Sequence, residues 1–298
     1  MRGMLPKNLY APRYWPEWLM VGFFAILVRV PWRLRLAVGR TIGRLARRFA
    51  GRRRHITAAN LALCLPELDA RERDALLEAH FESLGVGLIE MATAWWATDR
   101  NLPPGLVLNG LEHLERALTG GRGALLLTAH FTTLEMGARV LNLHRSVTAV
   151  YRPHENPVLD RVIRGGRLGR AGAMIERGDL RGMLRALRSG AVVWYAPDQA
   201  YLGPHGIEAP FFGIAAPTNT ATARIAAASR APVLPFFVRG LPHRDGYQVD
   251  IEAPLADFPS GDALADATRV NTVLEAGIRR APSQYLWSHD RFKRFRRP

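Results

Sequence analysis

A histidine and a glutamate stand five positions apart in the segment His130-Phe131-Thr132-Thr133-Leu134-Glu135, which follows the apolar run Ala124–Thr128 and Ala129. A neutral imidazole can take a proton from a hydroxyl near physiological pH, and an acid beside it fixes the ring and stabilises the imidazolium. On one helix the two side chains would lie about 140° apart, which is poor geometry. They meet only if His130 precedes the helix and a threonine caps it, so that Glu135 turns back toward the ring. The alternative on spacing alone is a capping threonine whose neighbours are incidental.

Other catalytic signatures are absent from the chain. It contains no Gly-x-Ser-x-Gly elbow, no His-Glu-x-x-His and no phosphate-binding loop, which argues against a serine hydrolase, a zinc protease and a P-loop enzyme. The single cysteine, Cys64, excludes an internal disulfide and a multi-cysteine zinc site, and we expect it to fill an apolar contact. A base and an acid without a protein nucleophile predict that a substrate hydroxyl attacks an activated acyl group directly. We expect neither a metal nor a cofactor.

Charged residues follow two more apolar runs. Arg152 comes after Val147–Tyr151, Asp198 comes after Ala191–Ala196, and a helical segment between them ends with Arg167 and Arg170. The three arginines could bind phosphate or carboxylate oxygens through forked hydrogen bonds. Asp198 could orient a guanidinium or the substrate. The alternative, that Arg167 and Asp198 are ordinary surface charges, stays open on the sequence alone.

The elements that must position these residues alternate between strand and helix from about residue 105. Short apolar runs predict strands at Leu106–Leu108, Ala124–Thr128, Val147–Tyr151, Ala191–Ala196, Val233–Val238 and Tyr247–Ile251. Amphipathic segments predict helices at Leu111–Leu118, Leu134–Leu143, Pro157–Leu168, Leu180–Arg188, Thr218–Ser229 and Ala263–Arg280. This alternation predicts an α/β fold with a mixed, largely parallel sheet flanked by helices. Ligands in such sheets gather beyond the carboxyl ends of the strands, where the candidate residues lie.

The first third of the chain is predicted to be helical. Asp69 is a candidate N-cap for a helix that runs to Trp95 and Trp96, two residues that we interpret as packing or interface anchors. We therefore predict two regions: residues 1–50 as a membrane anchor with a basic juxtamembrane segment, and residues 51–298 as the catalytic domain, helical over 51–104 and α/β over 105–298.

The anchor prediction rests on an apolar run followed by positive charge. Trp18–Val28 carries no charged residue, and residues 29–54 contain ten arginines and no acidic residue. Anionic lipid headgroups attract such a segment, and the positive-inside tendency would keep it and the rest of the chain cytoplasmic. No cleavage site follows, so we do not expect a signal peptide. Whether the helix spans the bilayer or lies in it stays open, and a core helix followed by a solvated arginine face is the alternative.

The formal net charge of +15 predicts a polyanionic partner: nucleic acid, an anionic membrane surface, or an acidic protein or substrate. A non-catalytic, charge-driven binder of nucleic acid or of an anionic membrane is therefore an alternative to the enzyme. However, the chain contains no nucleic-acid motif, and its clustered arginines adjoin the apolar run, so we expect an anionic membrane and no nucleic acid.

Several motifs together resemble the late (secondary) acyltransferases of lipid A biosynthesis, within the lysophospholipid acyltransferase group. The resemblance runs nearly end to end and is carried by Arg52-Arg53-Arg54, Asn60-Leu61, Cys64-Leu65-Pro66-Glu67, Phe81-Glu82-Ser83, His130-Phe131-Thr132-Thr133-Leu134-Glu135, Tyr151-Arg152-Pro153, Gly166-Arg167-Leu168, Val193-Trp194-Tyr195-Ala196-Pro197-Asp198-Gln199 and Gln284-Tyr285-Leu286-Trp287-Ser288-His289. The histidine-four-acid element is weakly specific alone and strong in this combination.

The resemblance implies an activity and a site. An acyl chain would pass from acyl carrier protein to the hydroxyl of a 3-hydroxyacyl chain on the Kdo-bearing, anionic lipid A precursor, at the cytoplasmic face of the bacterial inner membrane. His130 would be the general base, Glu135 its partner, and Arg167 and Asp198 further important residues. Glu135 stands where glycerolipid acyltransferases usually have aspartate, and Thr132-Thr133-Leu134 is similar to the lauroyl branch. The nearest alternative is an acyltransferase of the same fold acting on a glycerolipid or a phosphatidylinositol mannoside.

Overall fold

A computed structural model describes residues 8–170, 172–241, 243 and 246–292, so the outer ends of the predicted anchor and catalytic regions lie outside the described residues. Four helices precede the first strand: α1 (Trp15–Leu27), α2 (Trp32–Phe49), α3 (Gly51–Cys64) and α4 (Ala70–Trp96). The predicted start of α4 is confirmed by a capping box. The side chain of Asp69 accepts a hydrogen bond from Glu72 N, and the side chain of Glu72 accepts one from Asp69 N. None of the helices within these residues has the length and apolar character that crossing a bilayer requires.

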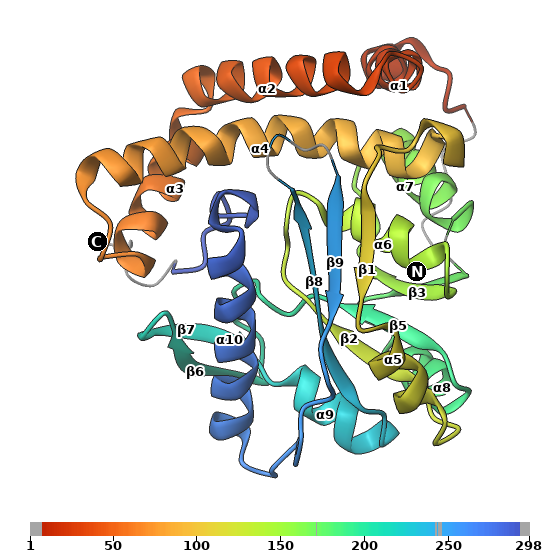
Figure 1. Cartoon of the computed structure of the whole chain (residues 1–298), viewed down its shortest axis with the longest axis vertical. Helices are drawn as coiled ribbons and strands as arrows, with labels where there is room; N and C mark the ends of the chain where they lie inside the picture. Colours follow the sequence, from red (N-terminus) through yellow and green to blue (C-terminus); the bar gives the residue numbers. More distant parts are fainter. Residues whose placement is uncertain (1–7, 171, 242, 244–245, 293–298) are drawn as a thin grey trace.

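The predicted α/β fold is confirmed. The main sheet has the order β1-β9-β8-β2-β5-β3-β4, in which only the β8–β9 pair is antiparallel. Its strands are β1 (Leu106–Asn109), β2 (Ala124–Leu127), β3 (Val147–Tyr151), β4 (Ala173–Glu176), β5 (Val192–Tyr195), β8 (Val233–Gly240) and β9 (Tyr247–Ile251). Six of these strands were predicted within two residues at each end. The parallel strands β2, β5 and β3 end on the same side of the sheet. The loop after β2 lies against α4, where a Cβ at Gly87 would stand 3.0 Å from Thr132, and α4 crosses above the sheet (Figure 1).

Three strands were not predicted. Edge strand β4 is short, and β6 (Gly206–Phe211) and β7 (Ile214–Asn219) form a separate hairpin. Proline within each hairpin strand weakens the strand signal. The turn between them places Phe212 at φ 51° and Gly213 at φ 76°, as a primed two-residue turn requires. Because Thr218 and Asn219 pair in this hairpin, the helix predicted from residue 218 begins only at Ala221.

Helices cover both faces of the main sheet. They are α5 (Leu111–Leu118), α6 (Leu134–Asn142), α7 (Pro157–Leu168), α8 (Leu180–Arg188), α9 (Ala221–Ser229) and α10 (Ala263–Arg280). Alternate residues of β2 point to opposite faces: Ala124 and Leu126 belong to the core beneath α5 and α6, whereas Leu125 and Leu127 belong to the core beneath α8, α9 and α10. Strand β2 is therefore central, and the loop that follows it is fixed from both sides.

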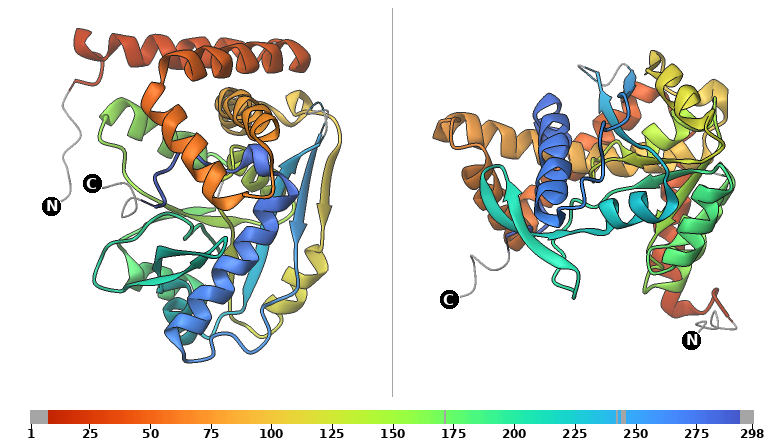
Figure 2. Two further views of the ribbon diagram at one scale, coloured as in Figure 1. Left: turned by 90° about the vertical axis from the view of Figure 1, so that its left-hand side faces the viewer. Right: turned by 90° about the horizontal axis from the view of Figure 1, so that it is seen from below.

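Helices α4 and α2 form a further layer across the end of the sheet, with α1 and α2 outermost (Figure 2). Helix α2 can lie this close to α4 because glycines face one another. A Cβ atom at Gly85 of α4 would stand 2.0 Å from the carbonyl oxygen of Gly39, and one at Gly43 would stand 2.1 Å from the carbonyl oxygen of Phe81. Helix α4 thus connects the outer layer to the edge where the candidate residues lie.

Candidate active site

His130 lies just beyond the carboxyl end of β2 and contacts Asp198, which follows β5. The imidazole Nδ1 is 2.6 Å from Asp198 Oδ1, and the backbone amide of His130 donates to Asp198 Oδ2 at 3.1 Å. Parallel pairing of β2 with β5 puts these two strand ends side by side. Asp198 is 2% exposed and the His130 side chain is 32% exposed. The carboxylate therefore holds one ring nitrogen in the interior, and part of the ring stays accessible to a substrate.

The pair is electrostatically coupled. Burial on its own lowers the pKa of the His130 imidazole, but the charge and hydrogen bond of Asp198 outweigh burial, and the pKa is raised above its ordinary value. The reverse holds for the acid: burial raises the pKa of Asp198, and the contact with His130 more than offsets this, so the pKa is lowered. An ionised carboxylate beside Nδ1 fixes the tautomer in which Nε2 is the free base.

Two buried residues near the C-terminus surround Asp198. Burial, followed by the proximity of Asp198, raises the pKa of the Tyr285 hydroxyl well above its ordinary value, so Tyr285 stays a neutral hydrogen-bond donor. Arg291 is 2% exposed, donates to Pro217 O at 2.7 Å and lowers the pKa of Asp198 through its charge. Neither role was predicted, although Tyr285 belongs to a segment that carries the family resemblance.

Glu135 has other partners than the imidazole. Its carboxylate forms a salt bridge with Arg167, through both Nε and Nη2, and its Oε2 accepts from the indole of Trp95 at 2.8 Å. The structure therefore corrects the expectation that Glu135 steadies the ring, because Asp198 occupies that position. The His130–Asp198 pair and the Glu135–Arg167 salt bridge are neighbours nonetheless, since the charge of Arg167 lowers the pKa of His130. Trp95, predicted only as an anchor, helps to fix Glu135.

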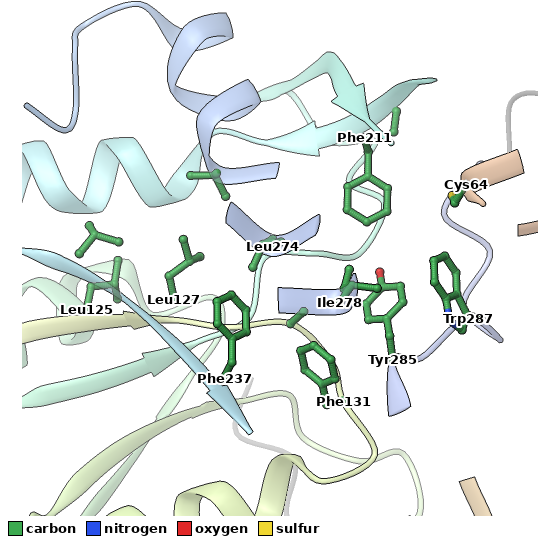
Figure 3. Packing of buried hydrophobic residues seen from close by; sticks show 14 of the residues in the cluster. Cys64, Leu125, Leu127, Phe131, Phe211, Phe237, Leu274, Ile278, Tyr285 and Trp287 are labelled. Atoms are coloured by element: carbon green, nitrogen blue, oxygen red, sulfur yellow. The ribbon is translucent and has the colours of Figure 1, made fainter. Parts of the chain in front are cut away.

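The C-terminal segment holds the loop after β2. Thr132 N donates to Gln284 O at 2.8 Å, Leu286 N donates to His130 O at 2.9 Å, and Phe131 forms a β-bridge with Tyr285. The rings of Phe131 and Tyr285 meet edge to face at 6.0 Å, in the aromatic core that Figure 3 shows. The amide of Asn60 on α3 donates in turn to Trp287 O and His289 O. Residues distant in sequence thus fix the position of His130.

The same core contains Cys64, as the sequence predicted: the thiol is buried among apolar side chains, at 1% exposure (Figure 3).

The other two predicted substrate ligands lie apart from this cluster. Arg152 is exposed and faces Glu155 at 3.6 Å. Arg170 donates to Ala97 O at 2.6 Å and to Trp95 O at 3.3 Å, and thereby caps the carboxyl end of α4. The structure brings together His130, Glu135, Arg167 and Asp198, whereas substrate binding by Arg152 and Arg170 stays a prediction.

The loop also contains a buried hydroxyl. Thr132 Oγ1 has no hydrogen-bond partner in the part of the chain that the structure describes. It stands one residue before Thr133, the N-cap of α6. A half-buried base, a nearby arginine and a buried hydroxyl at a helix N-terminus are together suited to deprotonating an alcohol and stabilising the negative charge that develops when it attacks a carbonyl.

Sequence similarity to known proteins identifies the family of this chain. The sequence model of bacterial lipid A biosynthesis acyltransferases matches residues 5–294. The lipid A biosynthesis lauroyltransferase of Escherichia coli K12 is 40% identical over 97% of this chain and 96% of its own length. The palmitoleoyltransferase of the same organism is 37% identical over 96% and 94%, and its myristoyltransferase is 27% identical over 94% and 88%. The chain therefore belongs to the lipid A biosynthesis acyltransferases, and it is an enzyme of the acyltransferase type.

Proposed function

We propose that this enzyme transfers a fatty acyl chain from acyl-acyl carrier protein to the hydroxyl of a 3-hydroxyacyl chain on the Kdo-bearing lipid A precursor. The observation that carries the proposal is the contact between His130 Nδ1 and the buried carboxylate of Asp198 at the end of β2. With Nδ1 bound to Asp198, Nε2 is the ring nitrogen that can act as the base toward a substrate alcohol, and the reaction needs no protein nucleophile. The 40% identity to a lauroyltransferase favours a chain of about that length.

In the proposed reaction, His130 Nε2 takes the proton of the acceptor hydroxyl as its oxygen attacks the thioester carbonyl. Asp198 stabilises the imidazolium that forms. Collapse of the tetrahedral intermediate breaks the carbon–sulfur bond, and the imidazolium returns its proton to the departing thiolate. We assign the oxyanion to Thr132 Oγ1 and the N-terminal backbone amides of α6, since donors placed where charge develops give a large part of such catalysis.

We assign Glu135 and Arg167 a role in this site that differs from ring orientation. Their side chains are 11% and 19% exposed, so the ion pair is largely shielded from water. Trp95 and the salt bridge hold the Arg167 guanidinium near the imidazole, where its charge favours the neutral, basic form of His130. The same cation can attract the anionic acceptor. Glu135 is then essential through Arg167.

The outer helices support attachment to a membrane. Large apolar side chains on one stripe of α1 are exposed, namely Trp15, Leu19, Phe23 and Ile26, and α2 exposes Leu34, Leu45 and Phe49. Such stripes beside arginines are typical of helices that lie in the plane of an anionic bilayer surface. We therefore propose that α1 and α2 hold the enzyme at the cytoplasmic face of the inner membrane, with the end of the sheet directed to its lipid substrate.

One product analysis tests the proposal. The full-length enzyme is incubated with the Kdo-bearing lipid A precursor and an equimolar mixture of acyl-acyl carrier proteins of different chain lengths, and the lipid is analysed by mass spectrometry. We expect one added acyl chain, mainly lauroyl, and none with His130→Ala.

Parallel reactions supply a lysoglycerolipid or a phosphatidylinositol mannoside as the acceptor. Faster acylation of either would replace the lipid A precursor in this proposal, whereas no thioester consumption with any acceptor would refute transfer from carrier protein.

A further inference from the structure

A polar pocket of about 450 Å³ lies between α2, α4, the end of β8 and the turn after α10. Three arginines from different elements line it: Arg40 of α2, Arg239 of β8 and Arg280 of α10. None of them belongs to the cluster around His130. The chain therefore gathers positive charge in a second pocket, and none of the proposed proton-transfer steps involves it.

Most of this charge has no counter-ion within the described residues. Arg280 forms a salt bridge with Glu252 at 2.5 Å. Neither Arg40 nor Arg239 pairs with a carboxylate in the part of the chain that the structure describes. The one acidic side chain of the described lining, Glu82, is already bound to Arg44 at 3.0 Å.

Among the three arginines, Arg239 gives the strongest evidence for a bound ligand. Its Nε is buried and has no hydrogen-bond partner among the described residues. A buried donor of this kind is costly unless a ligand completes it. The guanidinium of Arg40 also has spare donors, because its only hydrogen bond with a described residue is a long one, 3.5 Å to His243 O. Two guanidiniums, one from helix α2 and one from strand β8, thus offer forked donors to the same pocket.

The pocket is connected to the reaction loop. Gln284, part of its wall, accepts from Gly240 N at 2.9 Å and donates to Gly240 O at 3.1 Å, which fixes the wall to the end of β8. The carbonyl oxygen of the same residue accepts from Thr132 N. One residue, Gln284, therefore lines the pocket and also contacts the loop of His130, so one large substrate could reach both.

We infer that this pocket binds a phosphoryl group of one of the two substrates, an inference that rests on the proposed function. Forked guanidinium donors match the oxygens of phosphate, and the volume admits a phosphate together with part of a sugar or pantetheine. The phosphoryl group belongs either to the headgroup of the acceptor lipid or to the phosphopantetheine arm of the donor. Both sources present the same oxyanion.

The test compares Arg239→Ala, Arg40→Ala and the charge-preserving Arg239→Lys with wild type, and takes Arg224→Ala as the control, since Arg224 is exposed on α9. Thermal unfolding first shows whether each variant is folded. Losing one charge-assisted hydrogen-bonding group should raise the KM of the phosphorylated substrate by about 10- to 100-fold and leave kcat within a few-fold. Arg239→Lys should fall between wild type and Arg239→Ala.

Matched substrates identify the source of the phosphate. If the acceptor supplies it, the KM of the acceptor rises and the variant no longer distinguishes the native from the dephosphorylated lipid. If the donor supplies it, the KM of acyl-acyl carrier protein rises and that of an acyl-pantetheine without phosphate does not. Unchanged KM values for both substrates, or an equal rise for phosphate-free substrates, would overturn the inference.

A binding measurement separates this inference from the proposed function. Glucosamine 1-phosphate is titrated into the full-length enzyme by calorimetry, and Arg239→Ala should weaken binding by about tenfold or more. Binding that depends on Arg239 in an enzyme that acylates no lipid A precursor would leave the pocket standing and refute the proposed acceptor. Equal binding by wild type and Arg239→Ala would refute the pocket.

Discussion

Replacing Asp198 by Asn tests the reasoning about the base most directly. The substitution keeps the shape of the side chain and removes the charge that stands 2.6 Å from His130 Nδ1. An amide can also present its NH2 group to the ring, which would favour the wrong tautomer. Because Asp198 is 2% exposed, bulk water has little access to the position of the lost charge.

The expected loss of kcat follows from the attraction between the His130 imidazolium and the Asp198 carboxylate. The charge centres of an imidazolium and a carboxylate in contact lie about 4 Å apart, and at an effective dielectric constant of about 20 they attract by about 4 kcal/mol. Each 1.4 kcal/mol lost from the transition state slows the reaction about tenfold. We therefore expect Asp198→Asn to lower kcat by roughly 10²- to 10³-fold, since the imidazolium is only partly formed at the transition state.

The assay is steady-state acyl transfer across a pH series, with purified enzyme and saturating acceptor. Without the carboxylate, burial dominates the environment of His130, so the acid limb of the pH profile should move below that of the wild type. Asp74→Asn is the matched control, because Asp74 is an exposed residue of α4. It should change neither the rate nor the profile.

Two results would refute this reasoning. One is an Asp198→Asn enzyme that keeps more than a tenth of the wild-type kcat, and the other is an acid limb that stays at the wild-type pH. The double variant His130→Ala with Asp198→Asn should be no slower than His130→Ala alone, because two residues that act as one unit are not additive.

Further predictions concern pH, the ion pair and the helix contact. Because only the neutral ring of His130 is a base, kcat/KM of the wild type should rise with pH. The pKa of His130 is raised, so the midpoint of this rise should lie above the ordinary histidine pKa of 6.5. A midpoint at or below 6.5 would contradict the geometry. Glu135→Gln leaves the Arg167 guanidinium without its carboxylate, so denaturant unfolding should show a loss of about 3 kcal/mol. Adding Arg167→Met should restore much of the stability and none of the activity. Gly85→Ala forces a Cβ into the backbone of α2, so thermal unfolding should show a loss of about 1–3 kcal/mol, whereas Gly120→Ala, at an open position, should be nearly neutral.

Local sequence patterns determined most of the fold. Helix α4 begins at Asp69 because a capping box is a contact between residues three apart, and β2 follows from an apolar run between polar segments. Both signals are complete within a few residues. The hairpin β6–β7 was not predictable in the same way, since its prolines weaken the strand signal and its pairing decides where α9 begins.

The site shows what only the tertiary structure decides. The sequence could name His130, Glu135 and Asp198, but which carboxylate contacts the ring depends on the parallel pairing of β2 with β5, a contact between residues 68 positions apart. Proximity in sequence favoured Glu135, and Arg167 from α7 draws that carboxylate into a different pair.

The environment of each arginine also depends on the tertiary structure. The ten arginines between residues 29 and 54 read as one basic segment. In the fold, Arg35 is 4% exposed and donates to Thr93 and to Asn101 O, while Arg40 faces a pocket with Arg239 and Arg280. The sequence determined how much positive charge the chain carries and where helices and strands form. The packing of distant segments determined which charges are neutralised. The reason is that a Coulomb interaction depends on the distance between two charges and on their burial, and both are properties of the folded chain.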